Sequence, residues 1–86
     1  MQLIGPEDAP VTRVAIGTGA ITPFMHLIDA YGADLAICTD DGFTYWRDGA
    51  LAMDLGIPAI IVNHAVSEVH GIKLLADHLA GRFPDL

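Results

Sequence analysis

Basic residues are scarce in this chain. Only 4 of its 86 residues are Lys or Arg, against 11 Asp or Glu, so the formal net charge is −7 with neutral histidines. Proteins that bind nucleic acid need clustered Lys and Arg to contact the phosphates. The composition therefore argues against a nucleic-acid partner.

Cysteine is also scarce, since Cys38 is the only one. One cysteine cannot form a disulfide within the chain, and its place in an apolar run predicts a small buried side chain in a reducing compartment. No run approaches the roughly 20 apolar residues of a membrane span. The N-terminus also lacks the basic and then apolar pattern of a signal peptide. We therefore expect a cytoplasmic protein with no membrane partner.

Apolar residues, in contrast, are abundant. They make up 52% of the sequence, yet a domain of this length buries only about three-fifths of its unfolded surface. The surplus predicts that some apolar surface lies against a partner. A small parallel sheet, which the order of apolar and helical segments predicts for this chain, would also leave two open edges and a poorly covered face. We therefore expect the chain to form a homo-oligomer.

Three short apolar runs alternate with three segments of helical period. The runs at residues 13–16, 35–38 and 59–62 predict strands. The predicted inward helix faces are Phe24, Leu27, Ile28 and Tyr31, then Trp46, Ala50 and Met53, then Ile72, Leu75, Ala76 and Leu79. The order βαβαβα predicts an α/β fold, with a small, mostly parallel sheet flanked by helices. We assign this domain to residues 11–86 and an N-terminal arm or linker to residues 1–10.

Local signals mark the ends of the predicted helices. Thr22 as a cap, with Pro23 at the first helical position, predicts the start of the first helix. Gly32 and Gly56 predict the ends of the first and second helices, and Gly81 the end of the third. Ser67, followed by a glutamate, predicts where the third helix opens.

A polar segment follows each predicted strand. These segments are Gly17-Thr18-Gly19, Thr39-Asp40-Asp41 and Asn63-His64. The carboxyl ends of parallel strands lie at the same edge of a sheet, where α/β proteins bind their ligands. We expect the three segments to line one cleft.

His64 and Glu68 are four residues apart where the third strand gives way to a helix. With Glu68 in the first helical turn, both side chains could bind one divalent ion, which their nitrogen and oxygen donors suit: Zn, Mn, Fe, Co or Ni. The alternative is a surface histidine beside a carboxylate that complements the helix dipole.

The other two segments allow more than one interpretation. Asp40 and Asp41 are candidate ligands, orienters of a ligating histidine or a general base, and the alternative is a helix cap or a turn at Gly42. Residues 17–22 carry two glycines of a dinucleotide-type loop, which makes Thr18 a candidate for substrate binding. There the alternative is a tight turn that needs glycine.

Four segments together resemble the C-terminal part of the NIF three-like family, a group of dinuclear-metal proteins often named GTP cyclohydrolase 1 type 2 homologues. They are residues 11–19, Gly32-Ala33-Asp34-Leu35 with Ile37-Cys38-Thr39-Asp40-Asp41, Gly56-Ile57, and Asn63-His64-Ala65-Val66-Ser67-Glu68. The family shows V-A-x-x-x-G, then G-A-D with T-G-D or T-G-E, and finally G-H-x-x-S-E. Asn63 replaces the last motif's glycine, and Asp40 replaces the glycine of T-G-D.

In that family the histidine and glutamate of H-x-x-S-E are metal ligands, so the resemblance implies that His64 and Glu68 contribute to a dinuclear metal centre. The family's other ligands lie in an N-terminal half that has no counterpart in these 86 residues. Completed by other ligands, such a centre would support metal-assisted hydrolysis of a phosphorylated or ring-containing small molecule. The main alternative is a non-enzymatic oligomerisation or regulatory module without metal. Nucleotide binding at residues 17–22 is a third.

Overall fold

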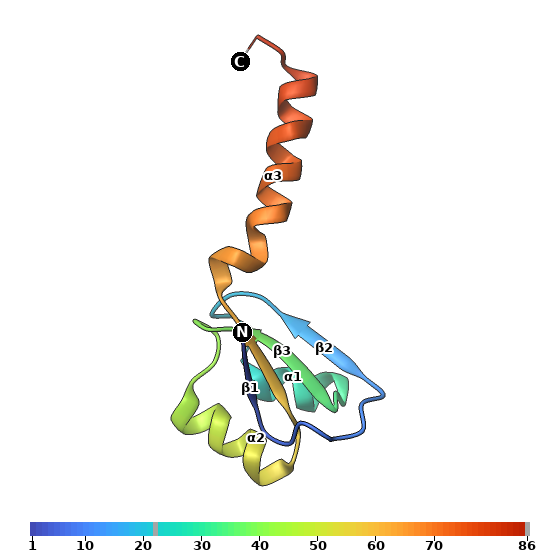
Figure 1. Ribbon diagram of the computed structural model, residues 1–86, viewed down its shortest axis with the longest axis vertical. Coiled ribbons are helices and arrows are strands. Elements are labelled where there is room, and N and C mark those ends of the chain that lie inside the picture. Colours follow the sequence, from blue (N-terminus) through green and yellow to red (C-terminus); the bar gives the residue numbers. More distant parts are fainter. Residues whose placement is uncertain (22, 86) are drawn as a thin grey trace.

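The computed structural model describes residues 1–21 and 23–85 (Figure 1). In chain order its elements are β1 (Gln2–Ile4), β2 (Val14–Gly17), α1 (Phe24–Tyr31), β3 (Leu35–Thr39), a π-helical turn (Tyr45–Gly49), α2 (Ala50–Leu55), β4 (Ala59–Val62) and α3 (His64–Arg82). The predicted α/β fold is confirmed. Among the described residues, no helix is long and apolar enough to cross a membrane.

The sheet has the strand order β1-β4-β3-β2. The three predicted strands β2, β3 and β4 are parallel, and β1 adds an antiparallel edge strand beside β4. The sequence had predicted three strands and an arm over residues 1–10. Part of that arm belongs to the sheet, because Gln2–Ile4 pair with β4. A run of three residues is too short to show a strand period.

One face of the sheet carries the hydrophobic core. The strand residues on this face are small or β-branched. Helix α1 packs against them with Phe24 and Leu27, and α2 packs against them with Ala52. The buried strand residues are Ala15, Ala36, Cys38, Ala59 and Ile61. Because β2, β3 and β4 lie in sequence order, right-handed crossovers place both connecting helices on this face. Burial raises the pKa of the Cys38 thiol to about 11, and its buried place in a strand agrees with the sequence prediction.

The first helix matches its predicted face in part. Phe24 and Leu27 are buried, Ile28 is partly buried, and Tyr31 is exposed. Gly32 closes the helix with φ 58°, as predicted. Pro23 is the capping residue and not the first helical one, while Thr22 lies outside the described residues.

The predicted face of the second helix is wrong. Trp46 and Met53 are 80% and 63% exposed, whereas Asp48 and Ala52 are buried. The wider π-helical turn before α2 changes which side chains point inward, because its period differs from 3.6 residues. The helix does end at Gly56, as predicted.

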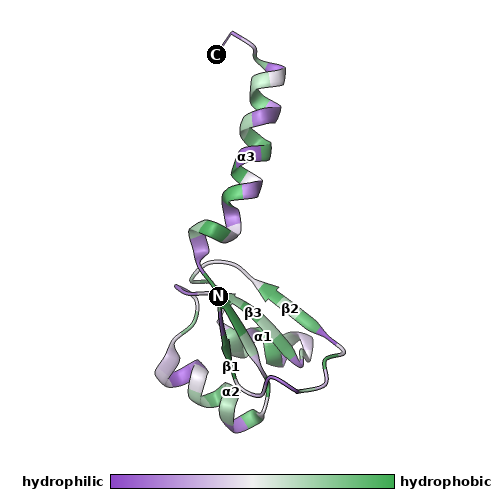
Figure 2. Cartoon of the chain, in the orientation of Figure 1, coloured by the Kyte–Doolittle hydropathy of each residue, from purple (hydrophilic) through white to green (hydrophobic). Residues whose placement is uncertain are grey.

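The third helix extends away from the sheet (Figure 1), and none of its residues is buried. The predicted inward positions Ile72, Leu75 and Leu79 are 43–64% exposed, and Ala76 is exposed as well. Hydrophobic and hydrophilic residues alternate along the helix (Figure 2). Gly81 lies inside it, since α3 continues to Arg82. The prediction that α3 packs inward is therefore wrong for the single chain.

Candidate metal centre

The junction between β4 and α3 places the predicted histidine and glutamate on one helix face. The helix begins at His64 and not at Ser67, because the side chain of Asn63 caps it by accepting the Val66 N–H at 3.0 Å. The Ser67 hydroxyl donates to the His64 carbonyl oxygen at 2.6 Å. Glu68 thus lies in the second turn and not the first, four residues after His64, where side chains meet.

The imidazole of His64 lies between two carboxylates. Its Nδ1 is 2.8 Å from Asp41 Oδ2, and its Nε2 is 2.9 Å from Glu68 Oε1. The hydrogen bond to Glu68 and the negative charges of both acids raise the pKa of His64, although desolvation opposes them. The side chains therefore form a continuous array, Asp41–His64–Glu68, from the second loop to α3.

Thr39 holds the acidic end of this array, a role that the sequence analysis had missed. Its buried hydroxyl donates to Asp41 Oδ1 at 2.7 Å and accepts the Gly19 N–H at 2.8 Å. The hydrogen bond from Thr39 and the charge of His64 lower the pKa of Asp41 against desolvation. A threonine at the polar end of an otherwise apolar strand was the signal available in the sequence.

The two neighbouring aspartates have different roles. Asp40 accepts the His64 N–H at 3.1 Å and the Asn63 side-chain amide at 2.9 Å, and these two bonds lower its pKa. It therefore fixes the backbone of the β4–α3 junction, as a cap would. Asp41 contacts the His64 ring instead.

Residues 17–19 reach the same edge of the sheet. A Cβ added at Gly19 would lie 3.6 Å from Cε1 of His64, and one added at Gly42 would lie 2.6 Å from the Gly19 carbonyl oxygen. The three polar segments thus meet, as the parallel topology predicted. Thr18 lies directly before Gly19. The loop is not at a helix N-terminus, because α1 begins only at Phe24, and the Gly19 N–H already donates to Thr39. These facts favour the tight turn over the nucleotide loop.

Substituting Gly42 by alanine tests this close approach. Because the added Cβ would meet backbone at 2.6 Å, Gly42→Ala is expected to lower the free energy of unfolding by about 1–2 kcal/mol, as overpacking does. Urea unfolding followed by circular dichroism measures the change. The control is Gly71→Ala in α3, where a Cβ meets open space and alanine should stabilise the helix by about 0.5–1 kcal/mol. Equal effects of the two substitutions would contradict the expectation.

The donor atoms fit part of a metal site. The 2.9 Å between Nε2 of His64 and Oε1 of Glu68 is close to the separation of two ligand atoms bound at about 2.0–2.2 Å to one ion. Metal-binding histidines usually donate their other ring N–H to a carboxylate, and Asp41 is placed to accept it. Over residues 1–21 and 23–85, however, no group of three His, Cys, Asp or Glu side chains could hold an ion.

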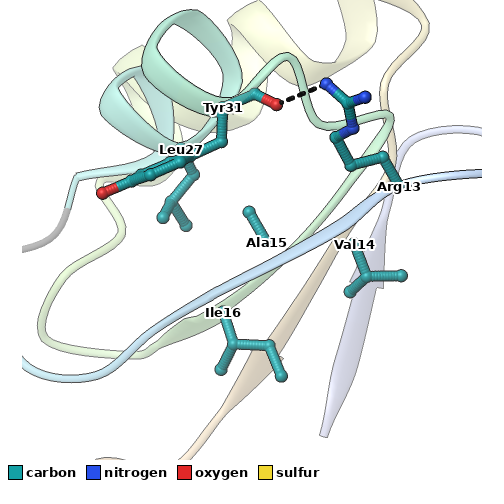
Figure 3. Close-up of a pocket in the computed structure, with 6 residues that line it drawn as sticks. All are labelled: Arg13, Val14, Ala15, Ile16, Leu27 and Tyr31. Atoms are coloured by element: carbon teal, nitrogen blue, oxygen red, sulfur yellow. Dashed lines mark hydrogen bonds between the residues drawn. The ribbon is translucent and has the colours of Figure 1, made fainter.

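The remaining histidines take no part in this array. His26, His70 and His78 are exposed on helices. Figure 3 shows a separate hollow of about 450 Å³ between β2 and α1, where Arg13 donates to the Tyr31 carbonyl oxygen at 3.1 Å. It is lined by Arg13, Val14, Ala15, Ile16, Leu27 and Tyr31, so it contains none of the predicted site residues.

One comparison with known proteins gave a match. The family model described as Duf34/NIF3 (NGG1p interacting factor 3) matches residues 1–86. No curated protein and no solved structure matches the chain.

Proposed function

The chain belongs to the Duf34/NIF3 family, and we propose that it supplies His64 and Glu68 as ligands to a dinuclear metal centre. The observation that supports this proposal is the position of the His64 ring, with Nε2 beside Glu68 at 2.9 Å and Nδ1 on Asp41 at 2.8 Å. In metal sites such a carboxylate fixes the ring orientation and its tautomer. Asp41 is then the residue that orients the histidine.

The metal centre that we propose includes ligands besides His64 and Glu68. Two ligands are fewer than the three or four that protein zinc sites use, so the missing ones come from another chain or from a further segment. The ion is a divalent one from the series Zn, Mn, Fe, Co and Ni, which imidazole and carboxylate ligands suit.

The activity that we propose is hydrolysis of a phosphorylated or ring-containing small molecule. A divalent ion held there would supply an activated water and polarise a substrate oxygen. The residues of this chain do the positioning: Asp41 holds the ring of His64, and Asp40 holds its backbone. Thr18 remains a candidate for contact with the substrate. We propose a cytoplasmic location, which a single buried cysteine fits.

Calorimetric titration with zinc or manganese tests the ligand assignment. The isolated chain is expected to bind weakly, with a Kd between roughly 10 µM and 1 mM, or about 4–7 kcal/mol, because it offers only two donors. His64→Ala should abolish this binding, and Asp41→Asn should weaken it about 10- to 100-fold. His70→Ala is the matched control, since this exposed histidine of the same helix lies outside the array.

Two results would contradict the proposal. Binding by His64→Ala that equals wild type would place the ion elsewhere. Tight binding of two ions by a monomer would show that the chain supplies a complete set of ligands and that the assignment to His64 and Glu68 is incomplete.

The alternative is an assembly or regulatory module without metal. One observation favours it: Asn63 and Asp40 cap and fix the start of α3, so these residues have a structural role without any ion. The absence of metal-dependent heat in the same titration, together with intact folding, would support this alternative.

A further inference from the structure

Thr39 is buried, whereas the three side chains of the array that it supports are partly exposed. It is 1% exposed, while the side chains of Asp41, His64 and Glu68 are 40%, 37% and 49% exposed. Burying a hydroxyl is costly unless its hydrogen bonds are satisfied. Both bonds of the Thr39 hydroxyl are directed at the loops that surround His64, so this side chain is the fixed end of the array.

The hydrogen bonds of Thr39 have a defined direction. A backbone N–H can only donate, so the bond of 2.8 Å from Gly19 uses a lone pair of the Thr39 oxygen. The single hydroxyl hydrogen is then directed to Oδ1 of Asp41, 2.7 Å away. An ionised carboxylate that accepts this hydrogen presents Oδ2 as a second acceptor, 2.8 Å from Nδ1 of His64. The hydrogen of the neutral imidazole is therefore placed on Nδ1.

Backbone contacts hold the carboxylate and the ring in this relation. The Gly42 N–H donates to the Thr39 carbonyl oxygen at 3.0 Å and closes the turn that contains Asp41. Asp40, the preceding residue, accepts the backbone N–H of His64 at 3.1 Å. Because β3 and β4 are neighbouring parallel strands, the loop after β3 and the start of α3 are fixed to each other. Asp41 is thus in place before it binds the ring.

Glu68, on the other side of the ring, is held less firmly. Its Oε1 is 2.9 Å from Nε2 of His64. Within the part of the chain that the structure describes, the Glu68 carboxylate has no other hydrogen-bond partner. It would lose side-chain freedom by holding a ring N–H, whereas Asp41 is already fixed by Thr39. The competition between the two carboxylates therefore favours a hydrogen on Nδ1.

We infer that Thr39 is a positioning residue that sets the tautomer of His64: through Asp41 it keeps the ring hydrogen on Nδ1 and leaves the lone pair of Nε2 directed at Glu68. A lone pair and a carboxylate oxygen are both acceptors, so a cation between them makes their approach favourable. The benefit for metal binding rests on the proposed function, whereas the tautomer itself does not. Thr39 would thus select the ligand atom of His64 without contact with the ion.

Long-range ¹H–¹⁵N NMR of the metal-free chain at alkaline pH, where the imidazoles are neutral, tests the tautomer. A ring nitrogen with a lone pair resonates well downfield of one that carries hydrogen. In wild type the lone pair is expected on Nε2 of His64. Thr39→Val removes the hydroxyl but keeps the branched shape, so the ring should sample both tautomers and its two nitrogens should move to intermediate shifts. Thr39→Ser keeps the hydroxyl and should restore the wild-type spectrum.

The matched control is Thr44→Val, because the Thr44 side chain does not cap the π-helical turn and lies outside the array. This variant should give the wild-type signals of His64. His70 and His78, which are exposed on α3, serve as references within each spectrum. A wild type with the hydrogen on Nε2 would overturn the inference without any variant. So would a Thr39→Val variant that is folded by circular dichroism and keeps the wild-type tautomer, as a merely structural threonine predicts.

Zinc titration of the same variants separates this inference from the proposed function. Thr39→Val is expected to weaken zinc binding about 10- to 100-fold, as the loss of a residue that supports a ligand does, and Thr39→Ser should bind like wild type. Equal binding by wild type and Thr39→Val would overturn the positioning role but leave the metal centre in place. A wild type that binds no zinc, with a tautomer that still depends on Thr39, would refute the metal centre and support the positioning role.

Discussion

Replacing Phe24 by alanine is expected to lower the free energy of unfolding by about 3–5 kcal/mol, the usual cost of a cavity left by phenylalanine. Phe24 is completely buried at the start of α1 and meets the ring of Phe43 edge to face, with centroids 5.8 Å apart. A chain of 86 residues has a total stability of roughly 4–13 kcal/mol. The loss is therefore a large part of the whole, and the variant should be partly unfolded near physiological temperature.

Urea unfolding followed by far-ultraviolet circular dichroism measures this loss. Tyr31→Ala is the control, because Tyr31 is an aromatic residue of the same helix but is 57% exposed. It should cost less than about 1 kcal/mol. A Phe24→Ala variant as stable as the control would show that the core on this face of the sheet does not support the fold.

The strands could be predicted from the sequence because their signal is local. Residues 59–62 are uninterrupted apolar and mostly β-branched, and β4 has these bounds. Parallel pairing followed from the helical segments between the strands, since a parallel crossover requires them. The same topology predicted that the polar segments after β2, β3 and β4 would meet.

The helix faces were harder to predict, because a face is defined by what packs on it. The period of Ile72, Leu75 and Leu79 identified an amphipathic helix correctly, but it could not tell whether the apolar side faces the same chain. The predicted face of the second helix was wrong for a local reason, because the π-helical turn at Tyr45–Gly49 changes the helical period within the segment. Such a turn has no reliable signature in a single sequence.

The individual contacts of the site depend on distances that spacing does not contain. Asp40 and Asp41 are adjacent and chemically identical, yet one bonds the backbone of His64 and the other its ring. The sequence therefore predicted that both aspartates lie near the histidine, but not which of them contacts its backbone and which its ring. The close approach of Gly42 to Gly19 joins residues 23 positions apart, and only the folded backbone reveals it.

Asp48 was absent from the sequence analysis, yet its substitution by alanine is expected to lower the free energy of unfolding by about 2–3 kcal/mol. Its fully buried carboxylate accepts the Thr44 N–H at 2.7 Å and two bonds from the Arg47 guanidinium at 2.9 and 3.0 Å. Alanine leaves the Thr44 donor unpaired at the start of the π-helical turn. Asp48→Asn keeps an acceptor for Thr44, so it should cost less.

The acid dependence of stability separates the charge of Asp48 from its hydrogen bonds. Burial raises the pKa of Asp48, but the hydrogen bonds from Arg47 and Thr44 and the charge of Arg47 outweigh it, so the pKa lies below its ordinary value. The unfolded chain therefore binds this proton more readily than the folded one. The charge of Asp48 contributes fully to the free energy of unfolding above the pKa of the unfolded chain, about 3.9. This contribution is lost as the pH falls through the lower pKa of the folded chain.

In urea unfolding at a series of pH values, the stability difference between wild type and Asp48→Asn should be constant near neutrality and shrink below about pH 4. The other aspartates titrate equally in both proteins, so a difference that stays constant down to the acid limit would show that the carboxylate charge of Asp48 does not stabilise the fold.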